Sequence, residues 1–227
     1  MNANKDFEFT TSDGLFVEAT TDASSVILKK FFYDYDRAFI LPDEKETING
    51  FRECLNLNSN KIGIHLSALY GSHFEVVSNV YEPLNRDNAI GGINFICYPI
   101  EKNNRNFLCA NLNYVYINPH YRGQGYLRKL VNVTRDCMDY VLEQSESQQL
   151  PHLIFAEQND PFRLTAEEYI QYTEHGGIDQ LDRLRIWARL GFRIIDFPYI
   201  QPPLSEDQEP DDGLLYSILA VQPFNLY

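Results

Sequence analysis

The sequence predicts one α/β (α+β) domain over residues 1–227, in which a run of strands leads into a single glycine-containing loop. Strand-type segments at 75–81, 89–100 and 107–117 are separated by turn residues, which indicates a meander. The loop 118–126 follows, with Gly123 and Gly125, and apolar residues then recur at helical spacing from 127 to 142. The fold should therefore be a mixed sheet flanked by helices.

The remaining elements are predicted from local patterns. A strand at 15–19 precedes a helix capped by Ser24 or Ser25, and a second helix should open at Pro42 and Asp43. A short apolar strand at 152–156 suits a central position. The segment 162–182 is expected to be an insertion, with a capping box that starts at Thr165. A helix at 181–190, a strand at 193–197, an acidic loop at 201–213 and a strand at 214–221 complete the chain.

Composition restricts the classes of partner. The net charge is −13, and no basic stripe is present, so we expect no nucleic acid and no anionic membrane surface as partner. A cationic amine would suit an acidic chain, although most acidic residues are expected to be solvated surface. The N-terminal residues resemble no signal peptide, and the four cysteines are expected to be buried free thiols, which predicts a cytoplasmic protein. The five histidines have no metal-ligand spacing, so no metal site is predicted.

The loop between the third of these strands and the long helix is typical of an anion site. Unpaired amides at a helix start carry partial positive charge, and glycines let the backbone approach a phosphate closely. An ordinary strand-to-helix turn would show the same residues. Arg122 could contact a phosphate directly or brace the loop from outside.

This loop resembles motif A of the GNAT superfamily of acyl-CoA-dependent N-acetyltransferases. The motif Arg/Gln-x-x-Gly-x-Gly/Ala aligns with Arg122, Gly125 and Leu127, and Leu127 departs from the usual small residue. The segment 184–192, which ends in Leu190-Gly191-Phe192, resembles the helix and Gly-Phe signature of the same family. The resemblance implies a sheet of about seven strands whose fourth and fifth strands splay apart, with the insertion 162–182 between the fifth strand and the last helix.

The resemblance also implies where acetyl-CoA binds. Its pyrophosphate would lie on the amides of five loop residues, and its pantetheine arm would run between 113–117 and 153–157, beside the amides of Val115 and Ile117. An amide near Val115 would hydrogen-bond the thioester oxygen. Asn159 matches an asparagine that binds pantetheine in the family, or it is a turn former. The five loop residues are Gly123, Gln124, Gly125, Tyr126 and Leu127.

Acetyl transfer to an amine requires a neutral nucleophile. An alkyl ammonium with a pKa near 10.4 costs about 4.6 kcal/mol to deprotonate at pH 7. Glu157, at the end of the short strand, is the first candidate for the base, and Asp160 is the second. Alternatively, Glu157 faces water and Asp160 belongs to a turn. The family often protonates the leaving thiolate from a tyrosine, but Trp187 stands at that place, so Tyr126, Tyr169, Tyr172 or Tyr199 would have to substitute.

The function expected from these features is transfer of an acetyl group from acetyl-CoA to a primary amine, on a small molecule or a peptide, by direct attack in a ternary complex. The acceptor site should involve 39–46, the insertion and the acidic loop. The alternative is a catalytically degenerate module that binds CoA or acyl-CoA, and a homodimer is compatible with either. Acidic residues that could attract the amine are Glu167, Glu168, Glu174, Asp179, Glu206, Asp207 and Glu209.

Overall fold

The computed structural model describes residues 5–41, 45–143, 150–201, 203 and 209–221. Within them, one mixed sheet of eight strands has the order β1-β2-β3-β4-β5-β6-β8-β7. All neighbouring strands are antiparallel except β5 and β6. The strands are β1 (Asp6–Thr10), β2 (Phe16–Thr20), β3 (Phe74–Tyr81), β4 (Gly91–Lys102), β5 (Arg105–Ile117), β6 (His152–Asn159), β7 (Arg193–Ile194) and β8 (Leu214–Val221).

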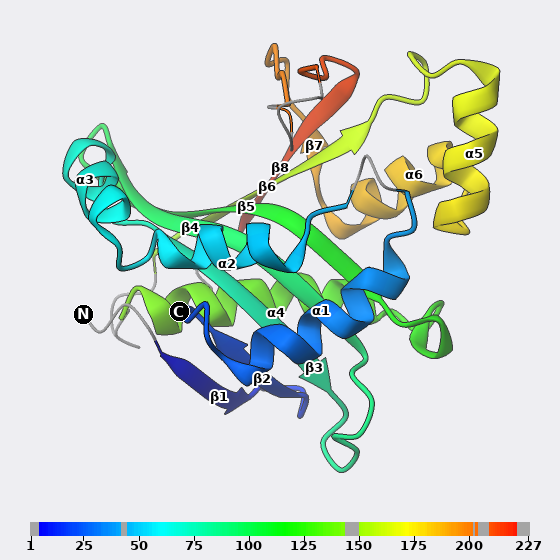
Figure 1. The fold of residues 1–227 in the computed structure, drawn as a ribbon. Helices are drawn as coiled ribbons and strands as arrows, with labels where there is room; N and C mark the ends of the chain where they lie inside the picture. The colour runs from blue at the N-terminus through cyan, green and yellow to red at the C-terminus, as the bar shows by residue number, and fades with distance from the viewer. Residues whose placement is uncertain (1–4, 42–44, 144–149, 202, 204–208, 222–227) are drawn as a thin grey trace, which may run out of the picture.

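Helices cover both faces of the sheet. The long helix α4 (Tyr126–Val141) packs on one face over β4 and β5, and α1 (Val26–Ala38) and α2 (Ile48–Asn56) pack on the other (Figure 1). The short helix α3 (Lys61–Tyr70) leads into β3, while α5 (Ala166–Gly176) and α6 (Gln180–Leu190) lie together at one end of the sheet (Figure 1). The predicted fold class is therefore confirmed.

Two hydrophobic clusters hold these layers together. The larger one joins α4 to the sheet through residues such as Leu130, Ile93 and Ile154, all with no exposed surface. The smaller one joins α1 and α2 to the opposite face, where Phe31 and Tyr35 are fully buried. Because α1 and α2 lie over β2 to β5, the same face of β6 and β8 has no helix above it in the described structure. This leaves room for a cavity.

Gly91 and Gly92 show why a strand starts with two residues that weaken strands. A Cβ at Gly91 would overlap the carbonyl oxygen of Tyr116, and one at Gly92 would lie 2.8 Å from ring atoms of Phe31 and Tyr116. Both glycines therefore allow β4 to approach its neighbours closely.

Several expectations need correction. The sheet has eight strands rather than about seven, because 6–10 forms an edge strand whose Phe7 packs on Tyr140 at 4.3 Å. Helix α3, capped by Asn60, was not expected, and the strand predicted at 193–197 has only two residues. Pro42 and Asp43 lie outside the described residues, and α2 begins instead at Ile48, with Thr47 as its N-cap.

Candidate active site

The glycine loop has the geometry of an anion site. After a 3-10 turn, η2 (Pro119–Tyr121), Gly123 and Gly125 take left-handed φ values of 75° and 81°. Gly125 is the N-cap of α4, and no side chain caps this end of the helix. A Cβ at Gly123 or Gly125 would meet no atom within 4 Å, so the loop backbone borders open space. The first amides of α4 are thus available to an external acceptor.

Arginines surround this end of the site. The Arg122 Nε donates to the carbonyl of Ile117 at 3.2 Å, and its Nη1 lies 3.2 Å from where a Cβ of Gly177 would be. Arg122 therefore braces the loop between the end of β5 and the end of α5. Among the described residues, the arginines that line the cavity beside the loop are Arg122, Arg128, Arg183 and Arg189.

The strands β5 and β6 separate at the point where the site begins. Their parallel pairing runs from Leu108 and His152 to Leu112 and Ala156 and then stops, although both strands continue. A bulge in β5 at Asn113 marks the divergence, since Phe95 pairs with Leu112 and Asn94 with Tyr114. The gap therefore opens later along β6 than expected. Leu153 to Ala156 still pair with β5, so of the expected stretch 153–157 only Glu157 lies beyond the last paired residue.

The amides of Val115 and Ile117 face this gap. The amide of Asn118 donates to the carbonyl of Ile90 at 2.8 Å, which sets the alternation of the β4–β5 ladder. In an antiparallel pair, alternate residues turn their backbone polar groups away from the partner strand. Val115 and Ile117 are those residues, so their N–H groups point toward the space between β5 and β6.

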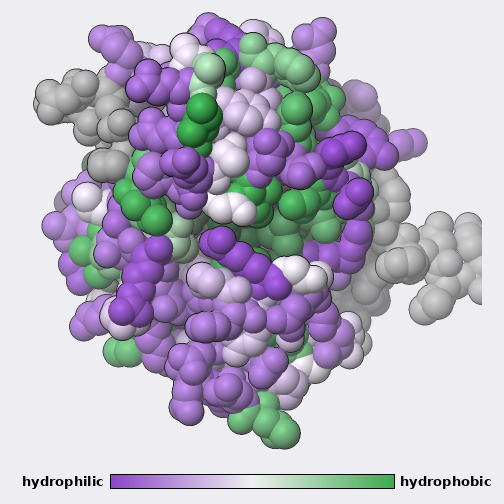
Figure 2. All heavy atoms as spheres, turned by 90° about the vertical axis from the view of Figure 1, so that its right-hand side faces the viewer, coloured by the Kyte–Doolittle hydropathy of each residue, from purple (hydrophilic) through white to green (hydrophobic). Residues whose placement is uncertain are grey.

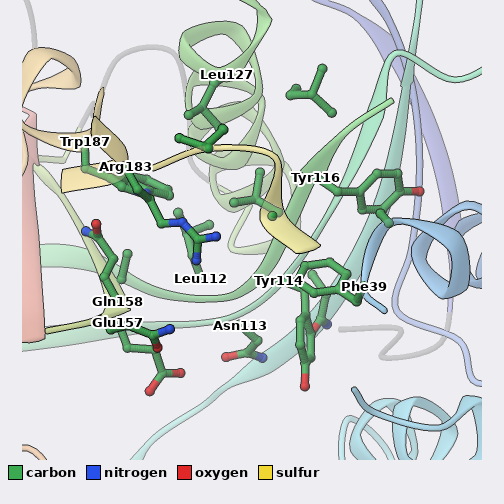
Figure 3. Close-up of a pocket in the computed structure, with 18 of the residues that line it drawn as sticks. Phe39, Leu112, Asn113, Tyr114, Tyr116, Leu127, Glu157, Gln158, Arg183 and Trp187 are labelled. Atoms are coloured by element: carbon green, nitrogen blue, oxygen red, sulfur yellow. The ribbon is translucent and has the colours of Figure 1, made fainter. Parts of the chain in front are cut away.

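One cavity of about 1380 Å³ connects the loop, the gap and the open sheet face. In Figure 2, the face of the molecule to the right of Figure 1 is hollowed near its centre, with hydrophobic residues inside and hydrophilic residues around the rim. Figure 3 shows Glu157 and Trp187 on one side of the cavity, Tyr114 and Phe39 on the other, and Asn113 between them. Val115, Ile117 and Asn159 also line it.

Glu157 has the environment of a general base. Burial raises the pKa of its carboxyl, and a hydrogen bond from the Tyr199 hydroxyl lowers it by less. Its Oε2 is buried and has no hydrogen-bond partner within the described structure. Tyr199 is held in place by stacking on Tyr216, with ring centroids 4.7 Å apart. A buried carboxylate oxygen without a donor is suited to receive an ammonium proton.

Asn159 and Asp160, which follow Glu157, differ in environment. The Asn159 Nδ2 is buried at the cavity without a partner in the described structure, as expected for a ligand-binding amide. The Asp160 carboxylate does not line the cavity and instead accepts from the amide of Phe162 at 3.0 Å. Asp160 thus makes the turn contact considered from the sequence.

The four tyrosines considered as proton donors have different surroundings in the structure. Tyr126 lines the cavity, but its hydroxyl donates to Glu82 at 3.3 Å; Tyr169 does not line it, and its hydroxyl donates to Asp179 at 2.7 Å. Tyr172 lines the cavity, as does Tyr199, which contacts Glu157. Trp187 packs nearly at right angles on Phe192 in the core and also borders the cavity.

The insertion contributes less acidic surface than expected. Its residues 175–178 line the cavity beside Arg122, while Glu168 and Asp179 cap α5 and α6. Glu206 and Asp207 lie outside the described residues. Carboxylates of the described chain that line the cavity are Glu46, Glu75, Glu157, Glu209 and Asp211.

Glu75 and Cys54 were not anticipated at this site. Cys54 is exposed and lines the cavity, whereas it was expected to be buried like the other three cysteines. Glu75 is a buried carboxyl on β3 that also lines the cavity. The signal for it was available, because an acidic residue in a strand buried on both faces needs a specific partner.

Comparison with known proteins gives only distant structural matches. No family model and no curated protein matches the sequence. A mutant spermidine N-acetyltransferase from Vibrio cholerae matches with 14% identity and a TM-score of 0.44, over 91% of this chain and 93% of that chain. The ribosomal-protein-S18-alanine N-acetyltransferase from Escherichia coli matches with 13% identity and a TM-score of 0.42, over 99% of both chains. Similarities this low assign neither an activity nor a substrate.

Proposed function

We propose that this protein is a GNAT-type N-acetyltransferase that moves an acetyl group from acetyl-CoA to a primary amine by direct attack in a ternary complex. The observation that supports this most is the single cavity that connects an uncapped helix start, two outward-facing strand amides and the buried carboxyl of Glu157. These are the parts that acyl transfer from an anionic thioester requires.

The residues around the cavity fit acetyl-CoA, which supplies a thioester carbonyl when bound. The amides from Gly123 to Leu127 and the nearby arginines would hold its phosphates. The amide of Ile117 and the unpaired Nδ2 of Asn159 would hold the amides of the pantetheine arm. Leu127 adds its side chain to the cavity wall and still has a backbone N–H, so this departure from the family motif is compatible with binding.

The chain itself would do three things during transfer. Glu157 would accept a proton from the acceptor ammonium, because its raised pKa brings it closer to that of the amine. The Val115 amide would donate to the carbonyl oxygen as negative charge develops on it. Tyr199 would orient Glu157 through their hydrogen bond. The acceptor is a small molecule or a peptide with a basic amine.

A second candidate function is binding of CoA or acyl-CoA without transfer. The observation that favours it is Trp187, because an indole packed in the core cannot protonate a leaving thiolate. Measured thiol release from acetyl-CoA over a panel of amines separates the two candidates. Transfer predicts amine-dependent release that Glu157→Gln lowers about 10²- to 10⁴-fold and Asp160→Asn leaves unchanged. Tight acetyl-CoA binding without release on any amine would instead support the binding module.

The remaining expectations stay predictions. No helix in the described part of the chain is long and apolar enough to cross a membrane. A cytoplasmic location and a homodimer rest on the sequence argument alone.

A further inference from the structure

A row of polar side chains crosses the open face of the sheet from β8 to β3. The Tyr216 hydroxyl donates to Asn111 Oδ1 at 2.7 Å, and Asn111 Nδ2 donates to Asn113 Oδ1 at 3.0 Å. Asn113 Nδ2 then donates to Glu75 Oε1 at 3.2 Å. Every donor in this row points toward Glu75, so the row ends on an acceptor.

One oxygen of Glu75 accepts two hydrogen bonds, and the other accepts none from the described residues. Asn94 and Asn113 both donate to Oε1, and no described residue donates to Oε2. The side chain is only 6% exposed, yet it lines the cavity. Burial raises the pKa of this carboxyl to about 7, although both amides lower it. A cationic donor that reached Oε2 would therefore satisfy this oxygen and stabilise the ionised form.

The walls of the cavity near Glu75 suit an organic cation. Phe39 and Phe51 contact the ring of Tyr114 edge to face, at 5.3 and 5.6 Å, and all three rings line the cavity. Glu46 lines the same region and adds a second carboxylate. Aromatic faces and carboxylates attract ammonium groups, whereas the arginines at the other end of the cavity attract anions.

The two buried carboxyls of the cavity lie on strands three positions apart. Glu75 is on β3 and Glu157 is on β6, which at the usual strand spacing are roughly 14 Å apart. Both residues line the same cavity. An acceptor could contact both only if its two donor groups were separated by several bonds.

We propose that Glu75 binds a second ammonium group of the acceptor, while Glu157 receives the proton of the amine that is acetylated. The acceptor is then a molecule with two basic amines, and Glu75 is a specificity-determining residue. This inference rests on the proposed function, because it assumes that the amine reacts beside Glu157.

The test compares aliphatic monoamines with α,ω-diamines of matched chain length, on the wild type, on Glu75→Gln and on Glu53→Gln. Glu53 is an exposed residue of α2 outside the cavity lining, so its variant controls for loss of one charge. In the wild type and in Glu53→Gln, kcat/KM should be about tenfold or more higher for the best diamine than for its monoamine. Glu75→Gln should remove this advantage by raising the KM of the diamine, with the monoamine unchanged.

Equal kcat/KM for monoamines and diamines in the wild type, or an equal loss for both in Glu75→Gln, would overturn the inference while leaving amine acetylation intact. Calorimetric titration of the best-bound diamine into the protein without acetyl-CoA decides the matter if no amine is acetylated. Binding that Glu75→Gln abolishes supports the inference even though the proposed function fails, and unchanged binding refutes it. If Glu75→Gln does not fold, Glu75→Asp should move the optimum to a longer diamine, and an unmoved optimum counts against the inference.

Discussion

Substitutions at Gly125 test the assignment of the glycine loop, because backbone strain and charge repulsion can be measured separately there. Replacing Gly125 by alanine forces a side chain into a left-handed conformation at a cost of roughly 1–2 kcal/mol. This should lower the melting temperature by about 2–4 °C for each kcal/mol. Gly125→Glu has the same backbone strain and adds a negative charge in the open space where phosphate is expected.

The magnitude follows from Coulomb's law. A carboxylate about 4 Å from a phosphate charge is repelled by about 1–4 kcal/mol, for effective dielectric constants between about 80 and 20. Acetyl-CoA should therefore bind about fivefold to several hundredfold more weakly to Gly125→Glu than to Gly125→Ala. Isothermal titration calorimetry measures both affinities directly.

Gly14 provides the matched control. It also has a left-handed φ of 86°, and the nearest atom to an added Cβ is 3.8 Å away. It lies between β1 and β2, away from the cavity lining. Gly14→Ala and Gly14→Glu should lower stability with no change in affinity for acetyl-CoA. Equal affinities for Gly125→Ala and Gly125→Glu, in folded protein, would refute the assignment of the loop to phosphate binding.

Three further predictions concern residues of the site and the core. Glu157→Gln should lower kcat about 10²- to 10⁴-fold. The wild-type rate should fall as pH drops through the raised pKa of Glu157, and a pH-rate profile of both proteins measures the two effects. Because the folded-state pKa of Glu75 is about 7, above the unfolded value of about 4.5, this group stabilises the fold below about pH 4.5. Its contribution to the free energy of unfolding falls by on the order of 3 kcal/mol as pH rises to 7. Urea denaturation at several pH values should therefore show a smaller fall in the free energy of unfolding for Glu75→Gln than for the wild type. Gly92→Ala should cost about 1–3 kcal/mol, seen as a lower urea midpoint, because its Cβ would press on two buried aromatic rings.

The positions of the main helices and strands could be predicted because local chemistry fixes them. These local signals each fix the end of an element within a few residues. They are the capping box at Thr165, the left-handed glycines Gly177 and Gly191 that end α5 and α6, and the Asn103-Asn104 turn between β4 and β5. The edge strand at 6–10 had a signal in the sequence, since Phe7 and Phe9 alternate with Asp6, Glu8 and Thr10. Only the tertiary structure shows that Phe7 is buried against Tyr140 of α4.

Some parts of the candidate site likewise follow from local sequence, and others depend on the tertiary structure. The sequence by itself determined the glycine loop, since a strand, two glycines and an amphipathic helix in succession leave unpaired amides whatever surrounds them. Glu157 and Asp160 could not be distinguished locally, because both were expected near the end of the same short strand. Only the tertiary structure gave them different environments, by burying Glu157 against Tyr199 and turning Asp160 toward the amide of Phe162. Glu75 entered the site in the same manner, since pairing of β3, β4 and β5 brings it to Asn94 and Asn113 from a distant part of the chain.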